Sequence, residues 1–285
     1  MTALATTIGE AREAVRAARR RGQGIGFVPT MGALHAGHAS LLGAARAETE
    51  FVVVSIFVNP TQFGPHEDFA NYPRPLEQDL ALCRQADVDL VFAPSAAEMY
   101  APDAATSIHV KGLTETMCGR SRPGHFDGVC TVVAKLLNIV QPDVVYLGEK
   151  DAQQLAVLRR MARDLDIPVR VRGCPLVRDA DGLALSSRNA YLSPEERQRA
   201  LALGRALLEA EAAIRAGERK ARRIAESVRR RLAEAPGVDL EYAVVADPDT
   251  LEPLGLIGGQ ALVAVAARVG KTRLIDNVLV RGLPG

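Results

Sequence analysis

The segment FVVVSIF, residues 51–57, most constrains the fold, because it is apolar and rich in β-branched side chains along its whole length except at Ser55. A strand with one face in water alternates polar and apolar residues, whereas a continuous run is typical of a parallel strand covered on both faces. Parallel neighbours need long crossover connections, which are usually helices. The segment therefore predicts a parallel sheet with helices on both of its faces.

Segments with the composition of helices and of short buried strands alternate from residue 9 to residue 173. We expect helices at about 9–21, 38–48, 76–86, 127–140 and 152–165, and strands at about 24–29, 51–59, 88–94, 143–147 and 169–173. Such an order predicts a doubly wound, Rossmann-like α/β domain, whose ligands bind beyond the carboxyl ends of the strands. We place this domain at residues 1–176.

The character of the sequence changes after about residue 176. Ser193, Pro194 and Glu196 form a helix start with a capping box, and a helical region follows to about residue 234, with a break near Gly217. Strand-like segments follow at 238–246, 261–269 and 273–280. We therefore expect a smaller C-terminal α+β domain with an antiparallel sheet at residues 177–285. Its arginine cluster at 222–231 is interspersed with glutamates, which favours a solvated helix face over a site for polyanions.

Net charge, apolar runs and cysteine spacing indicate which partners and which compartment to expect for this chain. The formal net charge is +1, which indicates neither nucleic acid nor a membrane surface as a partner. The apolar runs are far shorter than the ~20 residues of a membrane helix, and the N-terminus lacks the apolar core of a signal peptide. The four cysteines are widely spaced and predict buried free thiols in a reducing compartment. We expect a cytoplasmic protein.

The stretch PTMGALHAGHASL, residues 29–41, follows a predicted strand and enters a predicted helix. A helix N-terminus in this position presents free N–H groups and a positive dipole to an anion. Gly32 and Gly37 let the backbone approach a ligand closely, and His35 and His38 can both face the same pole. Two imidazoles there would donate hydrogen bonds to a phosphate group. The alternative is a pair of surface or capping histidines that bind no ligand.

Three further polar clusters stand near predicted strand ends or the domain junction. LGEKDAQQ, residues 147–154, combines the flexible Gly148 with Lys150, which can reach phosphates, and Asp151, which can cap a helix or bind a ribose hydroxyl. LALSSRN, residues 183–189, offers hydroxyl and guanidinium donors suited to polyphosphate. FVNPTQF, residues 57–63, places two amides, Asn59 and Gln62, where a hydroxy acid would bind. Each cluster alone is also compatible with an ordinary capped helix, turn or polar loop.

The histidine stretch resembles the H-x-G-H signature of the nucleotidyltransferase superfamily. Together with FVNPTQF, NYPR, GHFDGVCTVV, LNIVQPD, LGEKDAQQ, LSSRNAYL and ARVGKTRLIDN, in this order and across essentially the whole chain, it resembles the pantoate–β-alanine ligase family. The resemblance implies condensation of (R)-pantoate with β-alanine to give pantothenate, AMP and pyrophosphate. The implied route passes through an enzyme-bound pantoyl adenylate, formed from ATP with Mg²⁺. It also implies a homodimer, and a C-terminal domain that closes over the site.

The resemblance also implies roles for individual residues. His38 would be a proton donor, and His35 and Lys150 would stabilise phosphate charge. Pantoate and β-alanine would contact Asn59, Gln62, Tyr72, Arg122 and Gln154. ATP would contact Met31, Gly32, Ala33, Leu34, His35, Ala36, Gly37, His38, Gly148, Glu149, Lys150, Asp151, Val177, Leu185, Ser186, Ser187 and Arg188. Magnesium would be held mainly by phosphate oxygens, so we assign it no protein ligand.

Leu147, Leu185 and Pro75 depart from residues that the family commonly has (Phe, Met and Thr), and these departures affect the fine packing and not the chemistry. One rival function is an adenylyltransferase of the same superfamily that acts on a phosphate acceptor. The neutral amides favour a hydroxy-acid pocket over a phosphate pocket. A second rival is a nucleotide-binding module without enzyme activity.

Overall fold

The computed structural model describes residues 2–65 and 67–283 of the chain. The chain separates into two compact units. One unit consists of Met1–Glu149 with Val157–Pro175, and the other of Lys150–Ala156 with Leu176–Gly285.

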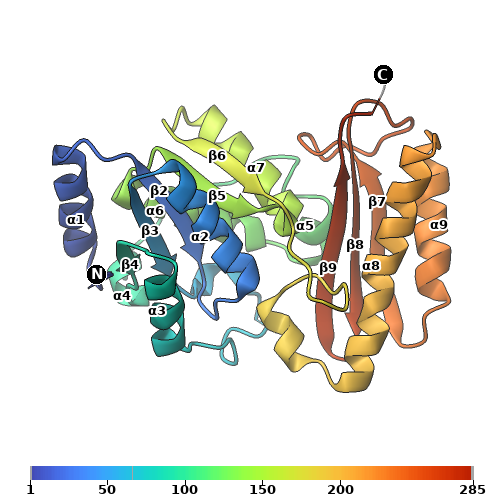
Figure 1. The fold of residues 1–285 in the computed structure, drawn as a ribbon, viewed down its shortest axis with the longest axis horizontal. Helices are drawn as coiled ribbons and strands as arrows, with labels where there is room; N and C mark the ends of the chain where they lie inside the picture. Colours follow the sequence, from blue (N-terminus) through green and yellow to red (C-terminus); the bar gives the residue numbers. More distant parts are fainter. Residues whose placement is uncertain (1, 66, 284–285) are drawn as a thin grey trace. The chain divides into compact units, whose positions relative to one another are not determined.

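The first unit is built on a six-stranded sheet in which every pairing is parallel (Figure 1). The strand order is β1-β4-β3-β2-β5-β6. The strands are β1 (Ala3–Ala5), β2 (Ile25–Thr30), β3 (Phe51–Ile56), β4 (Leu90–Phe92), β5 (Val144–Gly148) and β6 (Arg170–Cys174). Because the order reverses direction between β2 and β5, ligands are expected beyond the carboxyl ends of the central strands.

Helices cover both faces of this sheet, as the continuous apolar run predicts (Figure 1). On one face, side chains of α2 (Ala36–Glu48) and α3 (Leu76–Gln85) form a core with Val28 and Val54. The neighbouring strand residues Phe27 and Val53 point to the opposite face, where α1 (Ile8–Arg20) and α6 (His125–Val140) pack together. The remaining helical elements up to residue 164 are η1 (Pro60–Gln62), α4 (Ala96–Met99), α5 (Met117–Ser121), η2 (Glu149–Asp151) and α7 (Ala152–Asp164).

The second unit has a three-stranded antiparallel sheet in the order β7-β8-β9, formed by Val238–Ala246, Ala261–Val269 and Thr272–Val280. Two helices, α8 (Pro194–Arg215) and α9 (Ala221–Ala233), pack on it and share its apolar core (Figure 1). A short 3-10 helix, η3 (Ser187–Tyr191), precedes α8. Ser193 and Glu196 make the predicted capping box, and Gly217, with φ of 109°, lies in the predicted break.

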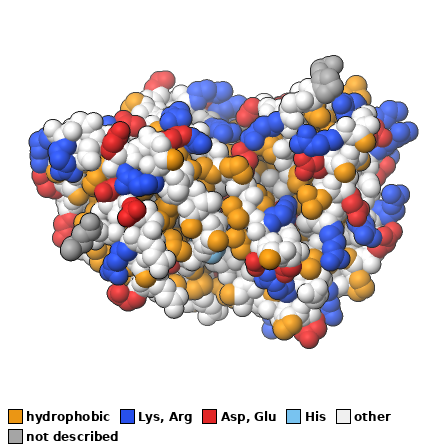
Figure 2. Space-filling view, in the orientation of Figure 1, with side chains coloured by type: hydrophobic (Ala, Val, Ile, Leu, Met, Phe, Trp, Pro, Cys, Tyr) orange, Lys and Arg blue, Asp and Glu red, His pale blue; other side chains and the backbone are white. Residues whose placement is uncertain are grey.

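These features confirm the predicted fold class, a Rossmann-like parallel sheet with a smaller α+β domain. Arg222, Arg223 and Arg231 of α9 form ion pairs with neighbouring glutamates, such as Arg222 with Glu226 at 2.7 Å, in keeping with the prediction of a solvated face. On the face drawn in Figure 2, basic and acidic side chains are interspersed. Within residues 2–65 and 67–283, no helix is both long and apolar enough to cross a membrane.

Candidate active site

The loop from β2 to α2 is held by a carboxylate of α3. Gly32 and Ala33 have positive φ values of 84° and 50°, which turn the next two backbone N–H groups toward Asp79. The Asp79 carboxylate accepts hydrogen bonds from Ala33 N at 2.9 Å and from Leu34 N at 2.7 Å, and its residue is only 1% exposed. Burial raises the pKa of Asp79, and the two N–H groups offset part of that effect. The Asp79 carboxylate therefore fixes the conformation of this loop before any ligand binds.

The two predicted histidines cap the first turn of α2. His35 is the N-cap residue, and its Nδ1 accepts a hydrogen bond from Gly37 N at 3.1 Å. His38 lies three residues on, and its Nδ1 accepts from His35 N at 3.3 Å. The ring centroids are 4.2 Å apart. Because a neutral imidazole carries one hydrogen, both rings then have it on Nε2, which makes each Nε2 a donor at the helix N-terminus.

The two amides that follow β3 form one buried cluster. Asn59 is 1% exposed, and its Nδ2 donates to Gln62 Oε1 and to Gly128 O, both at 3.1 Å. Its Oδ1 accepts from the Tyr100 hydroxyl at 2.8 Å. The second amide nitrogen, Gln62 Nε2, lies 2.9 Å from Met31 Sδ. The structure thus brings Met31 and Gln62 together, while Asn59 fixes which end of the Gln62 amide is the donor.

Two further residues predicted on the substrate side, Tyr72 and Arg122, lie near this cluster in the fold. Tyr72 is 5% exposed and packs edge-on against Phe63, with ring centroids 5.9 Å apart. Arg122 follows α5 and forms an ion pair with Glu67, with Nε 2.6 Å from Oε1. Their predicted contact with substrate stays a prediction.

The cluster after β5 begins in the first unit with Gly148 and Glu149 and continues in the second unit. Lys150 Nζ lies 3.5 Å from Asp151 Oδ2. The backbone oxygen of Lys150 accepts a hydrogen bond at 2.8 Å from Nδ2 of Asn277 on β9. Gln154 is half-buried on the first turn of α7. The main chain of Lys150 is therefore anchored independently of its ammonium group.

Residues 177–188 form a second feature of this unit. Leu185 N donates a hydrogen bond to Val177 O at 3.0 Å, so these two residues, both predicted to contact ATP, lie side by side. Arg178, between them in sequence, forms an ion pair at 2.7 Å with Asp276 of β9, which is 4% exposed. The predicted polar residues come next, with Ser186 as the N-cap of η3 and Ser187 and Arg188 inside it.

Sequence reasoning missed the residues that support the site. Asp79 contacts Ala33 from 46 residues away, and Tyr100 contacts Asn59 from 41 residues away. Asp276 contacts Arg178 from 98 residues away. No local sequence pattern predicts such contacts, although Asp276 lies within ARVGKTRLIDN, one of the eight motifs shared with the pantoate–β-alanine ligase family. Among residues 2–65 and 67–283, no group of three or more His, Cys, Asp or Glu side chains is arranged to hold a metal ion.

Comparison with known proteins identifies the family. The family described as Pantoate-beta-alanine ligase matches residues 3–279. The chain belongs to this family. Pantothenate synthetase of Moorella thermoacetica is 55% identical over 277 residues, which are 97% of this chain and 98% of the relative. That of Acetivibrio thermocellus is 51% identical over 96% of this chain and 98% of the relative.

Solved structures of the family match as well. Pantothenate synthetase of Thermus thermophilus has a TM-score of 0.94 and 49% identity, covering 99% of this chain and all of that one. Pantoate-beta-alanine ligase of Francisella tularensis, in complex with βγ-ATP and β-alanine, has a TM-score of 0.79 and 35% identity, with 98% of each chain covered. The resemblance read from eight sequence motifs is therefore confirmed at the level of the family.

Proposed function

We propose that this pantoate–β-alanine ligase family member condenses (R)-pantoate with β-alanine to give pantothenate, AMP and pyrophosphate at the expense of ATP. The observation that carries the proposal within the chain is the paired histidine cap of α2, with two Nε2–H donors at a helix N-terminus. Such a pole suits a phosphate chain whose negative charge increases during reaction. The Francisella relative, whose structure contains βγ-ATP and β-alanine, supports the same assignment.

The reaction is proposed to pass through a pantoyl adenylate. A carboxylate is a poor electrophile, so an oxygen of pantoate first attacks the α-phosphorus of ATP, and the bond to pyrophosphate breaks. The amine of β-alanine then attacks the acyl carbon of the mixed anhydride, and AMP leaves with the bonding electron pair. A site that excludes water protects the anhydride between the two steps.

ATP is proposed to contact Met31–His38, Gly148–Asp151, Val177 and Leu185–Arg188. Within this set, His35 Nε2–H and the ammonium of Lys150 stabilise the charge that develops on the phosphates, and His38 Nε2–H donates a hydrogen bond to a phosphate oxygen. Asp151 suits a ribose hydroxyl, and the paired Val177 and Leu185 offer apolar surface for the adenine.

Pantoate is proposed to contact the amides of Gln62 and Gln154, and Asn59, Tyr72 and Arg122 are proposed to support the pocket around Gln62. Amides suit a hydroxy acid because each supplies both a donor and an acceptor. Asn59 is almost fully buried and its amide is bonded at both ends, so its effect on pantoate passes through the Gln62 side chain.

ATP is proposed to enter as its magnesium complex. Within the described residues there is no carboxylate cluster for a resident ion, so the phosphate oxygens supply most of its ligands. Four buried free cysteines are compatible with the reducing cytoplasm, the compartment that we propose. We also propose a homodimer, which light scattering on the purified protein tests, and closure of the C-terminal domain over the bound nucleotide.

The decisive experiment is exchange of labelled pyrophosphate into ATP. We expect exchange that requires pantoate and no β-alanine, followed by release of AMP and pantothenate once β-alanine is added. Exchange without pantoate, or no exchange in the presence of all substrates, would overturn the proposal.

The same experiment separates the two rival functions. An adenylyltransferase acting on a phosphate acceptor would form a dinucleotide-type product and release no AMP during acyl transfer. A binding module would take up ATP without turnover. The neutral amides of Asn59 and Gln62, which bond to each other in a buried cluster, favour the ligase.

A further inference from the structure

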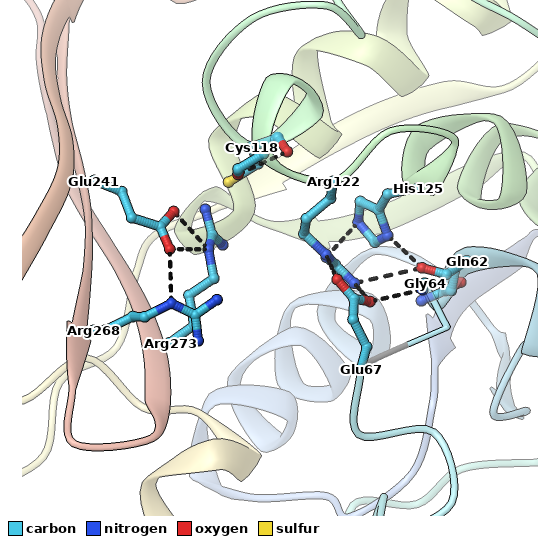
Figure 3. A network of polar contacts seen from close by, with 10 residues as sticks. Gln62, Gly64, Glu67, Cys118, Arg122, His125, Glu241, Arg268 and Arg273 are labelled. Atoms are coloured by element: carbon cyan, nitrogen blue, oxygen red, sulfur yellow. Dashed lines mark hydrogen bonds and ion pairs between the residues drawn. The ribbon is translucent and has the colours of Figure 1, made fainter.

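A network of polar contacts links Glu67, Arg122 and His125 to the Gln62 turn, the backbone from Gln62 to Gly64 in the first unit (Figure 3). The guanidinium of Arg122 and the carboxylate of Glu67 meet in a bidentate pair, with Nε to Oε1 and Nη2 to Oε2 both at 2.6 Å. The two side chains are only 15% and 26% exposed. Planar bidentate pairs of this kind fix orientation as well as distance.

The same guanidinium reaches the backbone of the turn through a histidine. Arg122 Nη1 lies 2.9 Å from His125 Nε2, and His125 Nδ1 lies 2.7 Å from the carbonyl oxygen of Gln62. A guanidinium can only donate, so Nε2 accepts, and Nδ1 carries the hydrogen that the carbonyl receives. Arg122 Nη2 makes a longer contact of 3.4 Å with the same oxygen. The Gln62 carbonyl therefore accepts hydrogen bonds from His125, the first residue of α6, and from Arg122, the residue that follows α5.

The Glu67–Arg122 pair also holds the backbone at Gly64, two residues after Gln62. Glu67 Oε2, which bonds to Arg122, also accepts from Gly64 N at 3.2 Å. Burial alone would raise the pKa of Glu67, but the hydrogen bond and charge of Arg122, with the N–H of Gly64, lower it to about 2. The carboxylate is thus ionised at neutral pH and stays bonded to the guanidinium.

We propose that Glu67, Arg122 and His125 form a latch that fixes the Gln62 turn in the geometry required for pantoate, with Arg122 as a positioning residue and not as a ligand of a substrate carboxylate. The inference rests on the proposed role of Gln62. Arg122 uses its N–H groups on Glu67, on His125 and on the Gln62 carbonyl. A substrate carboxylate would have to displace an ionised partner that is already in bidentate contact.

The test is a double-mutant cycle with Glu67→Ala, Arg122→Ala and the double variant, measured by KM for each substrate. If the latch acts as one unit, each single change raises KM for pantoate by about tenfold, the effect of one lost charge-assisted contact. KM for ATP then changes by less than about twofold, and the double variant resembles the single ones. If Arg122 instead binds a substrate carboxylate, Arg122→Ala weakens that substrate strongly, whereas Glu67→Ala, which frees the guanidinium, leaves its KM unchanged or lower. That result would overturn the inference.

Two controls separate positioning from general loss of structure. Arg46→Ala breaks another half-buried ion pair of the same unit, Arg46–Asp89 at 2.8 Å, and should lower stability without changing KM for pantoate. Hydrogen exchange of the backbone at residues 59–64 should accelerate in Arg122→Ala and Glu67→Ala but not in Arg46→Ala. If Arg122→Ala does not fold, Arg122→Lys replaces it, because lysine keeps the positive charge but cannot form the bidentate pair. Arg122→Lys should show both the raised KM for pantoate and the faster hydrogen exchange at residues 59–64. Unchanged exchange in a folded variant would refute the latch.

Gln62→Ala tells failure of the latch apart from failure of the proposed function. If Gln62→Ala leaves KM for pantoate unchanged, the role of Gln62 is wrong, whatever the latch does. If Gln62→Ala raises KM for pantoate and the latch variants leave both KM and hydrogen exchange unchanged, the site assignment stands and the latch does not.

Discussion

At the scale of single residues, each histidine uses one ring nitrogen, Nδ1, to cap the helix, and is proposed to use the other, Nε2, for chemistry. His35 and His38 both accept backbone hydrogen bonds at Nδ1, so both present N–H at Nε2. Substitutions can separate the two roles because the amide of Asn overlays the Nδ1 position of a histidine, whereas the amide of Gln overlays the Nε2 position. The residues need not be removed altogether to be tested.

We expect His38→Asn to keep the helix cap and to slow pantoate-dependent pyrophosphate exchange by about 10²–10³, as for loss of one preorganised donor. His38→Gln, which restores a donor near the lost Nε2–H, should recover part of that rate. Stopped exchange reactions measure both variants, and their far-UV circular dichroism checks the fold. A normal rate in a folded His38→Asn protein would exclude His38 from the chemistry.

Gln154→Ala should weaken pantoate far more than ATP, because its amide is proposed to hold the hydroxy acid and not the phosphates. Titration of each ligand separately, followed by calorimetry, gives the two affinities. Arg159→Ala, on the same helix α7 but outside the proposed site, is the matched control and should change neither. Equal losses for both ligands in Gln154→Ala would argue against the assigned role.

At the scale of elements, the site depends on how closely helix α6 approaches the turn η1. Gly128 lies within α6, and a Cβ atom added there would collide with the backbone oxygen of Thr61 and lie 2.7 Å from the nitrogen of Gln62. The Asn59 amide crosses the same contact to reach Gly128 O. Glycine is required at this position by the neighbouring backbone and not by its own φ angle.

Gly128→Ala should therefore raise KM for pantoate and lower stability, although alanine favours helices. Gly43 is the matched control, because it lies inside α2 with no atom within 4 Å of an added Cβ. Gly43→Ala should stabilise the protein by about 0.5–1 kcal/mol without changing KM. Urea unfolding and steady-state kinetics of both variants check the prediction, which fails if Gly128→Ala behaves like Gly43→Ala.

The sequence predicted those elements whose signal is local. The β-branched run at 51–57 correctly predicted a covered parallel strand, and the capping box at Ser193 correctly predicted the start of α8. Strand β1 was missed because ALA has no β-branched residue and depends on its pairing with β4. The latch was missed because Glu67 and Arg122 are 55 residues apart, and only the fold brings them together.

At the scale of the whole molecule, the lowered pKa of Glu67 links stability to acid. In the unfolded chain this carboxyl titrates near pH 4.5, and in the folded protein near pH 2. A depressed carboxyl pKa stabilises the protein above the unfolded value, and that contribution is lost as the pH falls through the window between the two.

The free energy of unfolding of the unmodified protein should therefore exceed that of Glu67→Gln at pH 6, and the difference should shrink as the pH falls from about 4.5 toward 2. Urea titrations at several pH values measure the difference, which isolates Glu67 because all other groups are shared. A difference independent of pH would show that the Arg122 pair does not control the ionisation of Glu67.

The capping box of His35 and His38 also couples the order of the first turn of α2 to the protonation of the two imidazoles. Adding a hydrogen to Nδ1 of either ring turns an acceptor into a donor that faces a backbone N–H, and the first turn of α2 then loses the bond that starts it. Loss of that acceptor should consequently fray this turn and disturb the paired Nε2–H donors together. In nuclear magnetic resonance spectra, the amide signal of Gly37 would then report directly on the imidazole of His35.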